Sequence, residues 1–367
     1  MPCHCSCGVP VHGAVGTLKG SSVMRCVLFV LFLVAACTTV SAADSFTDAI
    51  SAVQRDDYDL AARLFRPLAE QGHAGAQSFL GVLYANGQGV LQSHTAAAHW
   101  YQKAADQGDA AAQFQLGVLA VGGQGMPQNY DLAGQWYRRA AEQGVAGAQF
   151  RLGVLYEGGQ GVSQSYEEAI QWYRRAAAQG HARAQSHLGL LYARGQGVPK
   201  DYRVALQWYR SAAEQGDVLA QFQLGVLYAN GWGVPRNYGM AGQWYRRAAD
   251  QGDAVAQFNL AVRYDNGQGV PQSYEEAGRW YRQAAQQGHA RAQSNLGVLY
   301  AGGQGLPKDV IRAYMWLTVA VEESRGDDVK TATMNQTTVA ADMTAAQVEQ
   351  GQEMARRCRE SHFVECE

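Results

Sequence analysis

Hydrophobic and polar residues alternate along most of this chain with the spacing of α-helices. Ala76, Leu80, Leu83 and Tyr84 recur at intervals that place them on one helix face. The stretch 166–177 carries a second apolar stripe, formed by its tyrosines, its tryptophan and its alanines, at the same spacing. The pattern therefore predicts amphipathic helices that each bury one face.

A Gly-x-Gly motif separates these two kinds of helical stretch. An apolar residue and often a proline follow it, as in Gly195-Gln196-Gly197-Val198-Pro199. Glycine tolerates the left-handed backbone that ends a helix, and proline cannot continue one. Each motif thus predicts a turn between two antiparallel helices.

The two-helix pattern recurs every 36 residues. A Gln-Gly pair precedes each unit, and a tryptophan marks the second helix of each unit at the same step. Seven aligned units run from His73 to about Ser324 without insertion or deletion, which predicts a stack of similar units. The tryptophans are Trp100, Trp136, Trp172, Trp208, Trp244, Trp280 and Trp316.

Small residues recur at fixed positions in both helices of the unit. Because the distance between packed helices depends on the side chains at the contact, small residues let the two backbones approach closely. We expect the tryptophans and tyrosines to fill the wider parts of the seam as core residues, rather than to stack on ligands. The small residues of the first helix are Gly81, Gly117, Gly153, Gly189, Gly225, Ala261 and Gly297.

The unit A-x-A-Q-x-x-L-G-x-x-Y-x-x-G-x-G-V-P-x-x-Y-x-x-A-x-x-W-Y-x-x-A-A-x-Q-G resembles the Sel1-like repeat, a relative of the tetratricopeptide repeat. The resemblance covers about 250 residues in seven copies. It implies an all-α fold, a right-handed α-solenoid of antiparallel helix pairs, and a scaffold that binds protein partners. Four departures from the pattern are expected to alter only the packing or curvature of their own units: Ala120, Arg263, Trp232 and Leu317.

The segments on either side of the repeats are predicted to act as caps. The end units of a stack would otherwise expose an apolar face. The front cap resembles a tetratricopeptide-like hairpin, and the rear cap is predicted to contain helices over 327–341 and 345–357, with Thr344 as the N-cap of the second. The predicted divisions are a leader at 1–42, the front cap at 43–72, seven repeats at 73–324 and the rear cap at 325–367.

The first 42 residues have the pattern of a secretory signal. Arg25 precedes the apolar run Cys26–Cys37, and the small-residue site Val40-Ser41-Ala42 follows; this fits best if translation begins at Met24. A membrane anchor is the alternative, but an apolar run of 12 residues is too short to span a bilayer. Cys37 also fits a bacterial lipoprotein cleavage site. We therefore expect a periplasmic or secreted protein, either free or lipid-anchored at Cys37.

Cysteine usage agrees with export. Five of the seven cysteines lie in the predicted leader, and the two that remain are Cys358 and Cys366. Eight residues apart, they are predicted to close a small disulfide loop in an oxidising compartment; the alternative is two free thiols on a frayed tail. A Cys-His-Cys-Ser-Cys cluster at positions 3–7 has no partner cluster, so no metal site is predicted there.

Charge and composition argue against several functions. The formal net charge of −2 and a charged fraction of 17% indicate no phosphate-binding face, so no nucleic-acid partner is expected. His73, His181 and His289 recur every 108 residues, but repeats three apart are too distant to share a metal ion. Duplication of a three-repeat block explains this recurrence better. No cofactor or metal is predicted.

Protein binding is the function predicted from the stack, with specificity in positions that vary between units. The third and seventh positions of the first helix share one face and change from unit to unit. If that face is the concave one, it would contact the partner; the alternative is an unconstrained solvated face. The predicted partner-binding residues are Arg151, Arg183, His187, Gln223, Asn259, Arg291 and Asn295.

An enzyme is the competing class. Some secreted proteins that resemble this family are associated with β-lactam binding or hydrolysis, which implies a cell-envelope or peptidoglycan-related alternative. The sequence shows no nucleophile with a plausible base and oxyanion donor, and no glycine-rich phosphate loop after a strand. We therefore predict no catalytic residues.

Overall fold

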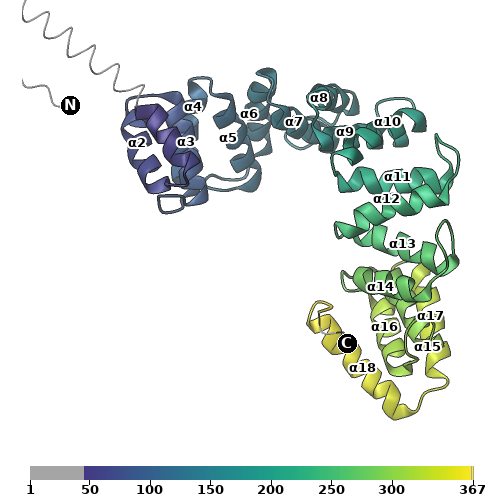
Figure 1. Ribbon diagram of the computed structural model, residues 1–367. Coiled ribbons are helices and arrows are strands. Elements are labelled where there is room, and N and C mark those ends of the chain that lie inside the picture. Colours follow the sequence, from purple (N-terminus) through teal and green to yellow (C-terminus); the bar gives the residue numbers. More distant parts are fainter. Residues whose placement is uncertain (1–44, 365, 367) are drawn as a thin grey trace, which may run out of the picture. The chain divides into compact units, whose positions relative to one another are not determined.

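The computed structural model describes residues 45–364 and residue 366 (Figure 1). These residues form helices and turns, with no β-strand among them. They fall into two compact units, one ending at Gln128 and the other beginning at Asn129. The predicted leader, with Met24 and Cys37, lies outside the described residues.

Short helices of similar length make up both units. In the first unit, residues 45–54 are helical, and they are followed by α2 (Tyr58–Glu70), α3 (Ala74–Asn86), α4 (His94–Asp106) and α5 (Ala110–Gly122). The repeats of the second unit contain α6 (Tyr130–Glu142), α7 (Ala146–Gly158), α8 (Tyr166–Ala178), α9 (Ala182–Arg194), α10 (Tyr202–Glu214), α11 (Val218–Asn230), α12 (Tyr238–Asp250), α13 (Ala254–Asn266), α14 (Tyr274–Ala285), α15 (Ala290–Gly302) and α16 (Val310–Glu323). Two further helices close the chain: α17 (Asp327–Ala340) and α18 (Ala345–Glu360).

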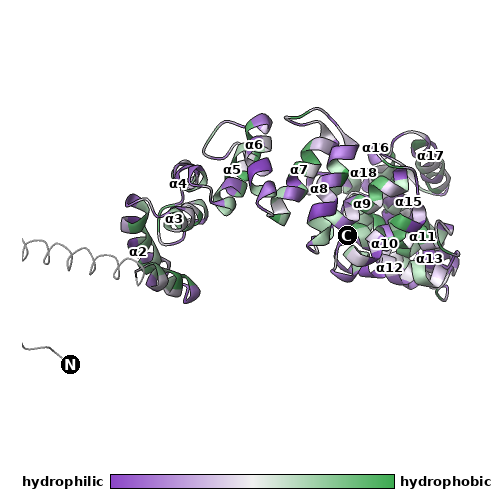
Figure 2. Cartoon of the chain, turned by 90° about the horizontal axis from the view of Figure 1, so that it is seen from above, coloured by the Kyte–Doolittle hydropathy of each residue, from purple (hydrophilic) through white to green (hydrophobic). Residues whose placement is uncertain are grey.

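Consecutive helices within each unit pack against each other, as α7 does against α8 and α9 against α10. Figure 2 shows hydrophobic and hydrophilic residues interspersed along the same helices, as expected for elements that bury one side. The predicted all-α fold of paired helices is confirmed. We call the helix before a Gly-x-Gly turn the first helix of its repeat and the helix after the turn the second helix.

The Gly-x-Gly turn is built from local capping and close backbone packing. Gly159 ends α7 with a φ of 65°, and the Ser165 hydroxyl then accepts a hydrogen bond from the N–H of Glu168 at 3.2 Å to start α8. A Cβ on the second glycine, Gly161, would lie 2.2 Å from the carbonyl carbon of Tyr130. The motif therefore ends one helix with its first glycine and packs closely against the start of the preceding helix with its second.

In four repeats the glycine of the first helix faces a buried tyrosine, whereas Gly297 of the last repeat faces Leu317. A Cβ on Gly153 would lie 2.6 Å from ring carbons of Tyr173, whose side chain is fully buried. The expectation that small residues permit close helix packing is thus confirmed at atomic detail. The same contact joins Gly81 to Tyr101, Gly189 to Tyr209 and Gly225 to Tyr245.

The repeated tryptophans contribute to the core, as predicted, although not uniformly. Trp208 and Trp244 are half-buried, whereas the other five are buried. Several have an arginine over the ring, as Arg175 lies 4.4 Å from the centroid of Trp172. The outer edge of the tryptophan row is therefore covered by long cationic side chains.

Buried glutamines link each repeat to the next. The side-chain amide of Gln221 donates to the carbonyl oxygen of Ala213 at 3.2 Å, and its Oε1 accepts from Nε2 of Gln251 at 2.8 Å. Gln251 belongs to the Gln-Gly pair that follows α12 in the same repeat as Gln221, whereas Ala213 lies in the preceding repeat, so the bond to Ala213 is the one that joins two repeats. The same pairing joins Gln77 to Gln107, Gln149 to Gln179, Gln185 to Gln215 and Gln257 to Gln287. We call this row the glutamine ladder.

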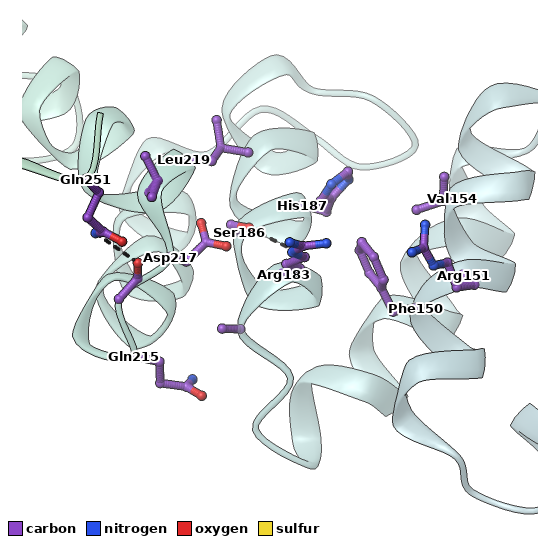
Figure 3. A pocket seen from close by; sticks show the side chains of 13 residues that line it. Phe150, Arg151, Val154, Arg183, Ser186, His187, Gln215, Asp217, Leu219 and Gln251 are labelled. Atoms are coloured by element: carbon purple, nitrogen blue, oxygen red, sulfur yellow. Dashed lines mark hydrogen bonds between the residues drawn. The ribbon is translucent and has the colours of Figure 1, made fainter. Parts of the chain in front are cut away.

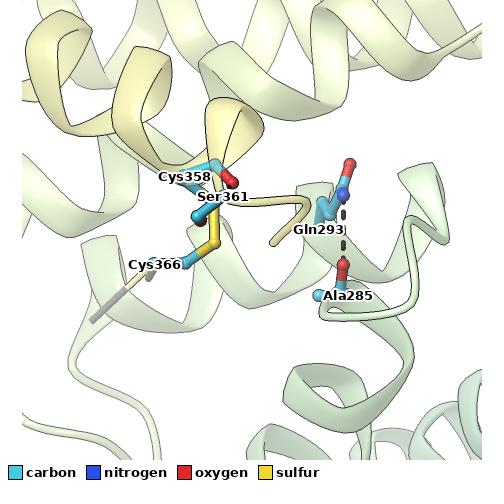
Figure 4. Close-up of a disulfide and its surroundings, with 5 residues drawn as sticks. All are labelled: Ala285, Gln293, Cys358, Ser361 and Cys366. Atoms are coloured by element: carbon cyan, nitrogen blue, oxygen red, sulfur yellow. Dashed lines mark hydrogen bonds between the residues drawn. A yellow bond between two sulfur atoms is a disulfide. The ribbon is translucent and has the colours of Figure 1, made fainter. Parts of the chain in front are cut away.

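The glutamine ladder stops at the last repeat. Gln293 still donates to Ala285 at 3.1 Å (Figure 4), but its fully buried Oε1 has no partner among the described residues. Glu323 occupies the position of the next ladder glutamine and is exposed. An ionised carboxylate has no proton to donate, which explains why the row ends there.

The C-terminal helices α17 and α18 both pack on α16. They fit the predicted spans, and Thr344 and Gln347 form a capping box at the start of α18. The predicted cysteine pair lies at the other end of α18, where Cys358 in its last turn and Cys366 after it are both buried and their sulfur atoms are placed at bonding distance (Figure 4). Oxidation of this pair in the protein stays a prediction.

The three regularly spaced histidines are helix N-caps. Nδ1 of His181 accepts the N–H of Ala184 at 3.2 Å, and His289 does the same at the start of α15. Burial lowers the pKa of both imidazoles, and the nearby charges of Arg183 and Arg291 act in the same direction. His73 caps α3 in the same way, and aspartates cap the corresponding helices at Asp109, Asp217 and Asp253.

We expect the protein to lose stability as the pH falls below about 6.5, and a His181→Asp/His289→Asp variant to lose less. The native state favours the neutral imidazole, so this stabilisation is present above the unfolded-state pKa and is lost as the pH falls toward the lower folded-state values. Thermal unfolding followed by circular dichroism from about pH 7.5 to 5.5 would measure the difference. Equal pH dependence in the two proteins would contradict this role.

Candidate partner-binding groove

A groove with a volume of about 740 Å³ crosses three successive first helices, α7, α9 and α11 (Figure 3). It contains three of the predicted partner-binding residues, Arg151, Arg183 and His187. Apolar side chains from the outer two helices complete much of its lining: Phe150, Val154, Val218 and Leu219.

The two arginines of the groove are unpaired. Arg151 on α7 and Arg183 on α9 are exposed, and neither guanidinium has a hydrogen-bond or ion-pair partner among the residues that the structure describes. Figure 3 shows both side chains on neighbouring helices, with the ring of Phe150 between those helices. The groove therefore presents two positive charges whose hydrogen-bond donors are free to engage a ligand.

His187 is held in place by a half-buried carboxylate. Its Nδ1 lies 3.0 Å from Oε2 of Glu157, which also accepts the hydroxyl of Tyr173 at 2.6 Å. Burial alone would raise the pKa of Glu157, but the hydrogen bonds from His187 and Tyr173 outweigh it and the pKa is lowered. Burial, together with the Glu157 charge, raises the pKa of Tyr173. The imidazole is thus fixed by an ionised partner beneath it.

Glu157 was not among the predicted site residues, although the sequence contains a signal for it. The corresponding position is acidic again only 108 residues later, at Asp265, and it is alanine or valine in the other repeats. Asp265 accepts the hydroxyl of Tyr281 at 3.0 Å, so both acids bind a core tyrosine. Of the two acids, only Glu157 also contacts a histidine, because Asn295 stands at the position that corresponds to His187.

The other predicted residues lie outside the groove. Arg291 forms an ion pair with Asp328 of α17 at 2.9 Å, so its charge is already compensated. The side chain of Asn259 donates to the carbonyl oxygen of Val255 in its own helix at 2.7 Å. Gln223 and Asn295 are half-buried on α11 and α15. The structure therefore brings together three of the seven residues and separates the remaining four.

The groove offers binding groups rather than a nucleophile with its base. Ser186 is its only hydroxyl side chain among the described residues, and it is 1% exposed and donates to the carbonyl oxygen of Arg183 at 3.0 Å. Within the described part of the chain, no group of three or more histidine, cysteine or acidic side chains is arranged to hold a metal ion. Guanidinium and imidazole groups beside apolar walls suit recognition of a polar ligand.

A sequence model described as the Sel1 repeat matches eight successive segments of the chain. They are residues 50–73, 74–109, 110–145, 146–181, 182–217, 218–253, 254–289 and 290–324. The chain belongs to the Sel1-repeat family. The first match extends the family into the segment predicted as the front cap. Sel1 repeats generally mediate protein–protein interactions and are typically non-enzymatic.

Solved structures of Sel1-repeat proteins share the fold. A Sel1 repeat protein from Oxalobacter formigenes is 37% identical, with a TM-score of 0.59, over 68% of this chain and 98% of that one. The protein c5321, a protective antigen of uropathogenic Escherichia coli strains, is 27% identical, with a TM-score of 0.52, over 89% of this chain and 93% of that one. No curated protein sequence matches the chain. Among the described residues, no helix is long and apolar enough to cross a membrane.

An arginine–tyrosine pair recurs across the Sel1 repeats and explains one departure from the family pattern. Arg174 donates to the hydroxyl of Tyr192, 18 residues later, at 2.6 Å. Where Ala120 replaces this tyrosine, Gln102 of the preceding repeat replaces the arginine. Both members change together, so no arginine is left without its acceptor. The other pairs are Arg66 with Tyr84, Arg138 with Tyr156, Arg210 with Tyr228, Arg246 with Tyr264 and Arg282 with Tyr300.

Proposed function

We propose that this chain is an exported Sel1-repeat scaffold that binds a protein partner through the first helices of its repeats, with the groove across α7, α9 and α11 as the principal contact. The observation that carries the proposal is the convergence of two unpaired arginines and an oriented histidine on one groove. Solenoid repeats commonly bind partners on the concave surface lined by one set of helices.

Replacing Arg151, Arg183 and His187 with alanine should reduce partner capture at least about tenfold while leaving helicity unchanged, because these side chains contribute to the groove rather than the core. The measurement is affinity capture from the native cell envelope with quantitative mass spectrometry. A Gln223→Ala/Asn259→Ala variant, altered on the same face outside the groove, is the matched control. Equal capture by all three proteins would exclude the groove as the contact.

We also propose that the protein acts in the periplasm or outside the cell, either free or anchored by a lipid on Cys37. The signal-like pattern of residues 1–42 and the restriction of later cysteines to Cys358 and Cys366 support this.

Export is expected to place the full-length protein in the envelope or medium fraction. Intact-mass analysis should then show removal of the leader and loss of two hydrogens at the cysteine pair. If the unaltered protein carries a lipid on Cys37, a Cys37→Ala variant should be lost from the membrane fraction; if it carries none, the two proteins should fractionate alike. Recovery of an uncleaved, reduced protein from the cytoplasm would refute export.

A further inference from the structure

We infer that the groove selects acidic peptide segments that carry apolar side chains between their carboxylates. This inference rests on the proposed partner-binding function and specifies the chemistry of the partner. It follows from three features. The groove has two arginines without an ion pair, it has apolar walls, and the neighbouring repeats do not combine these two properties.

The arginines of the groove form no ion pair with its own side chains. Its guanidinium groups, on Arg151 and Arg183, have no partner among the described residues. The carboxylate among the lining residues, Asp217, accepts the N–H of Ala220 at 2.9 Å, and Glu157, next to the groove residue His187, binds the tyrosine and histidine described above. Guanidinium groups bind carboxylates through paired, charge-assisted hydrogen bonds. A partner that supplies carboxylates therefore completes the groove.

The walls of the groove favour a peptide over a free small anion. Phe150 is 6% exposed and stacks on His181, with ring centroids 4.8 Å apart, so its ring is a rigid wall. Val154 and Leu219 are half-buried on opposite sides of the groove. Apolar side chains beside the carboxylates of a peptide would cover these surfaces and remove them from water. A small anion would leave them exposed.

The combination is confined to this part of the second compact unit. At the corresponding two positions, the next two repeats carry Leu219 with Gln223 and Val255 with Asn259, which are uncharged. In the following repeat, Arg291 is compensated by an acid of α17, as described above. An acidic segment is therefore directed to α7 and α9 rather than along the whole first-helix face.

The same features favour an acidic peptide over a nucleic acid. Nucleic-acid binding depends on several phosphate contacts along an extended basic surface, whereas this groove offers two arginines in a chain of net charge −2. Its walls are aliphatic except for the largely covered Phe150, so it offers no exposed aromatic platform for bases.

Fluorescence anisotropy with a labelled peptide of alternating aspartate and leucine residues tests the inference on the full chain. We expect binding at least about tenfold tighter than that of the matched asparagine–leucine peptide, because charge-assisted hydrogen bonds are lost in the latter. Binding should weaken as salt rises from about 50 to 300 mM. An Arg151→Gln/Arg183→Gln variant should lose about tenfold in affinity, whereas an Arg203→Gln/Arg357→Gln variant removes the same charge outside the groove and should not.

Equal binding of the acidic and neutral peptides, or an equal effect of the two double variants, would overturn the inference. Preferential binding of a labelled single-stranded oligonucleotide would also overturn it. If the alanine variant of the groove loses its envelope partner while the acidic peptide shows no preference, the proposed function stands and only the assigned chemistry is wrong. If the alanine variant keeps its envelope partner and the acidic peptide shows no preference, both the proposed function and the assigned chemistry are wrong.

Discussion

A Gly153→Leu variant is expected to lose about 3 kcal/mol of stability or more, because the new side chain has no space beside Tyr173. Even a Cβ at this position would lie 2.6 Å from the ring. The ring cannot turn away easily, since it is fully buried and its hydroxyl is held by Glu157. Relief of the clash would require α7 and α8 to separate and expose the apolar seam between them.

Gly158→Leu in the same helix is the matched control. Gly158 is exposed, and the nearest atoms to a Cβ there belong to the flexible side chain of Gln160, at 3.6 Å. This substitution should be neutral or stabilise the helix by up to about 1 kcal/mol, since leucine is the better helix former. Urea unfolding followed by circular dichroism would compare the two variants. Similar midpoints would show that the glycine–tyrosine contact does not limit helix packing.

A Gln221→Met variant is expected to lose about 2 kcal/mol, because it removes both hydrogen bonds of a ladder residue without changing its length much. Gln221 is 5% exposed, so the groups it leaves behind are poorly hydrated. The amide of Gln251 would lose its acceptor in the first helix of the same repeat, and the carbonyl oxygen of Ala213 in the preceding repeat would lose its donor. The measured quantity is the free energy of unfolding of the full chain.

Gln293→Met provides the control at the end of the glutamine ladder. Its Oε1 already lacks a partner among the described residues, so methionine removes one bond and also a buried unpaired acceptor. The expected loss is about 1 kcal/mol or less. A loss as large as that of Gln221→Met would mean that the glutamine–glutamine bond within a repeat contributes little beyond the glutamine–carbonyl bond between repeats.

Much of the fold could be predicted because its signals are local and repeated. Apolar spacing, the Gly-x-Gly turns and the Gln-Gly pairs each recur with the same step, so every repeat confirms the others. The end helices were also predictable, since Thr344 and the residues after it carry a capping signal. What the Gln-Gly phrase binds could not be read in this way, because its acceptor lies 30 residues earlier in the chain.

The candidate site was predictable only in part. Variation between repeats pointed to Arg151, Arg183 and His187, which lie along one groove. The same reasoning gave equal weight to Arg291, because an arginine at a variable position looks the same in the sequence whether or not an acid from a distant segment pairs with it. Glu157 was missed because it belongs to a different row of positions from the histidine it holds.

By itself, the sequence determined the two-helix repeat, its turns and its small-residue seams, because these depend on residues a few turns apart and on steric limits that each repeat meets in the same way. Only the tertiary structure decided which variable side chains form a site. Charge compensation acts between helices that are neighbours in space: Asp328 neutralises Arg291 from 37 residues away, whereas the described structure places no acid against Arg151 or Arg183.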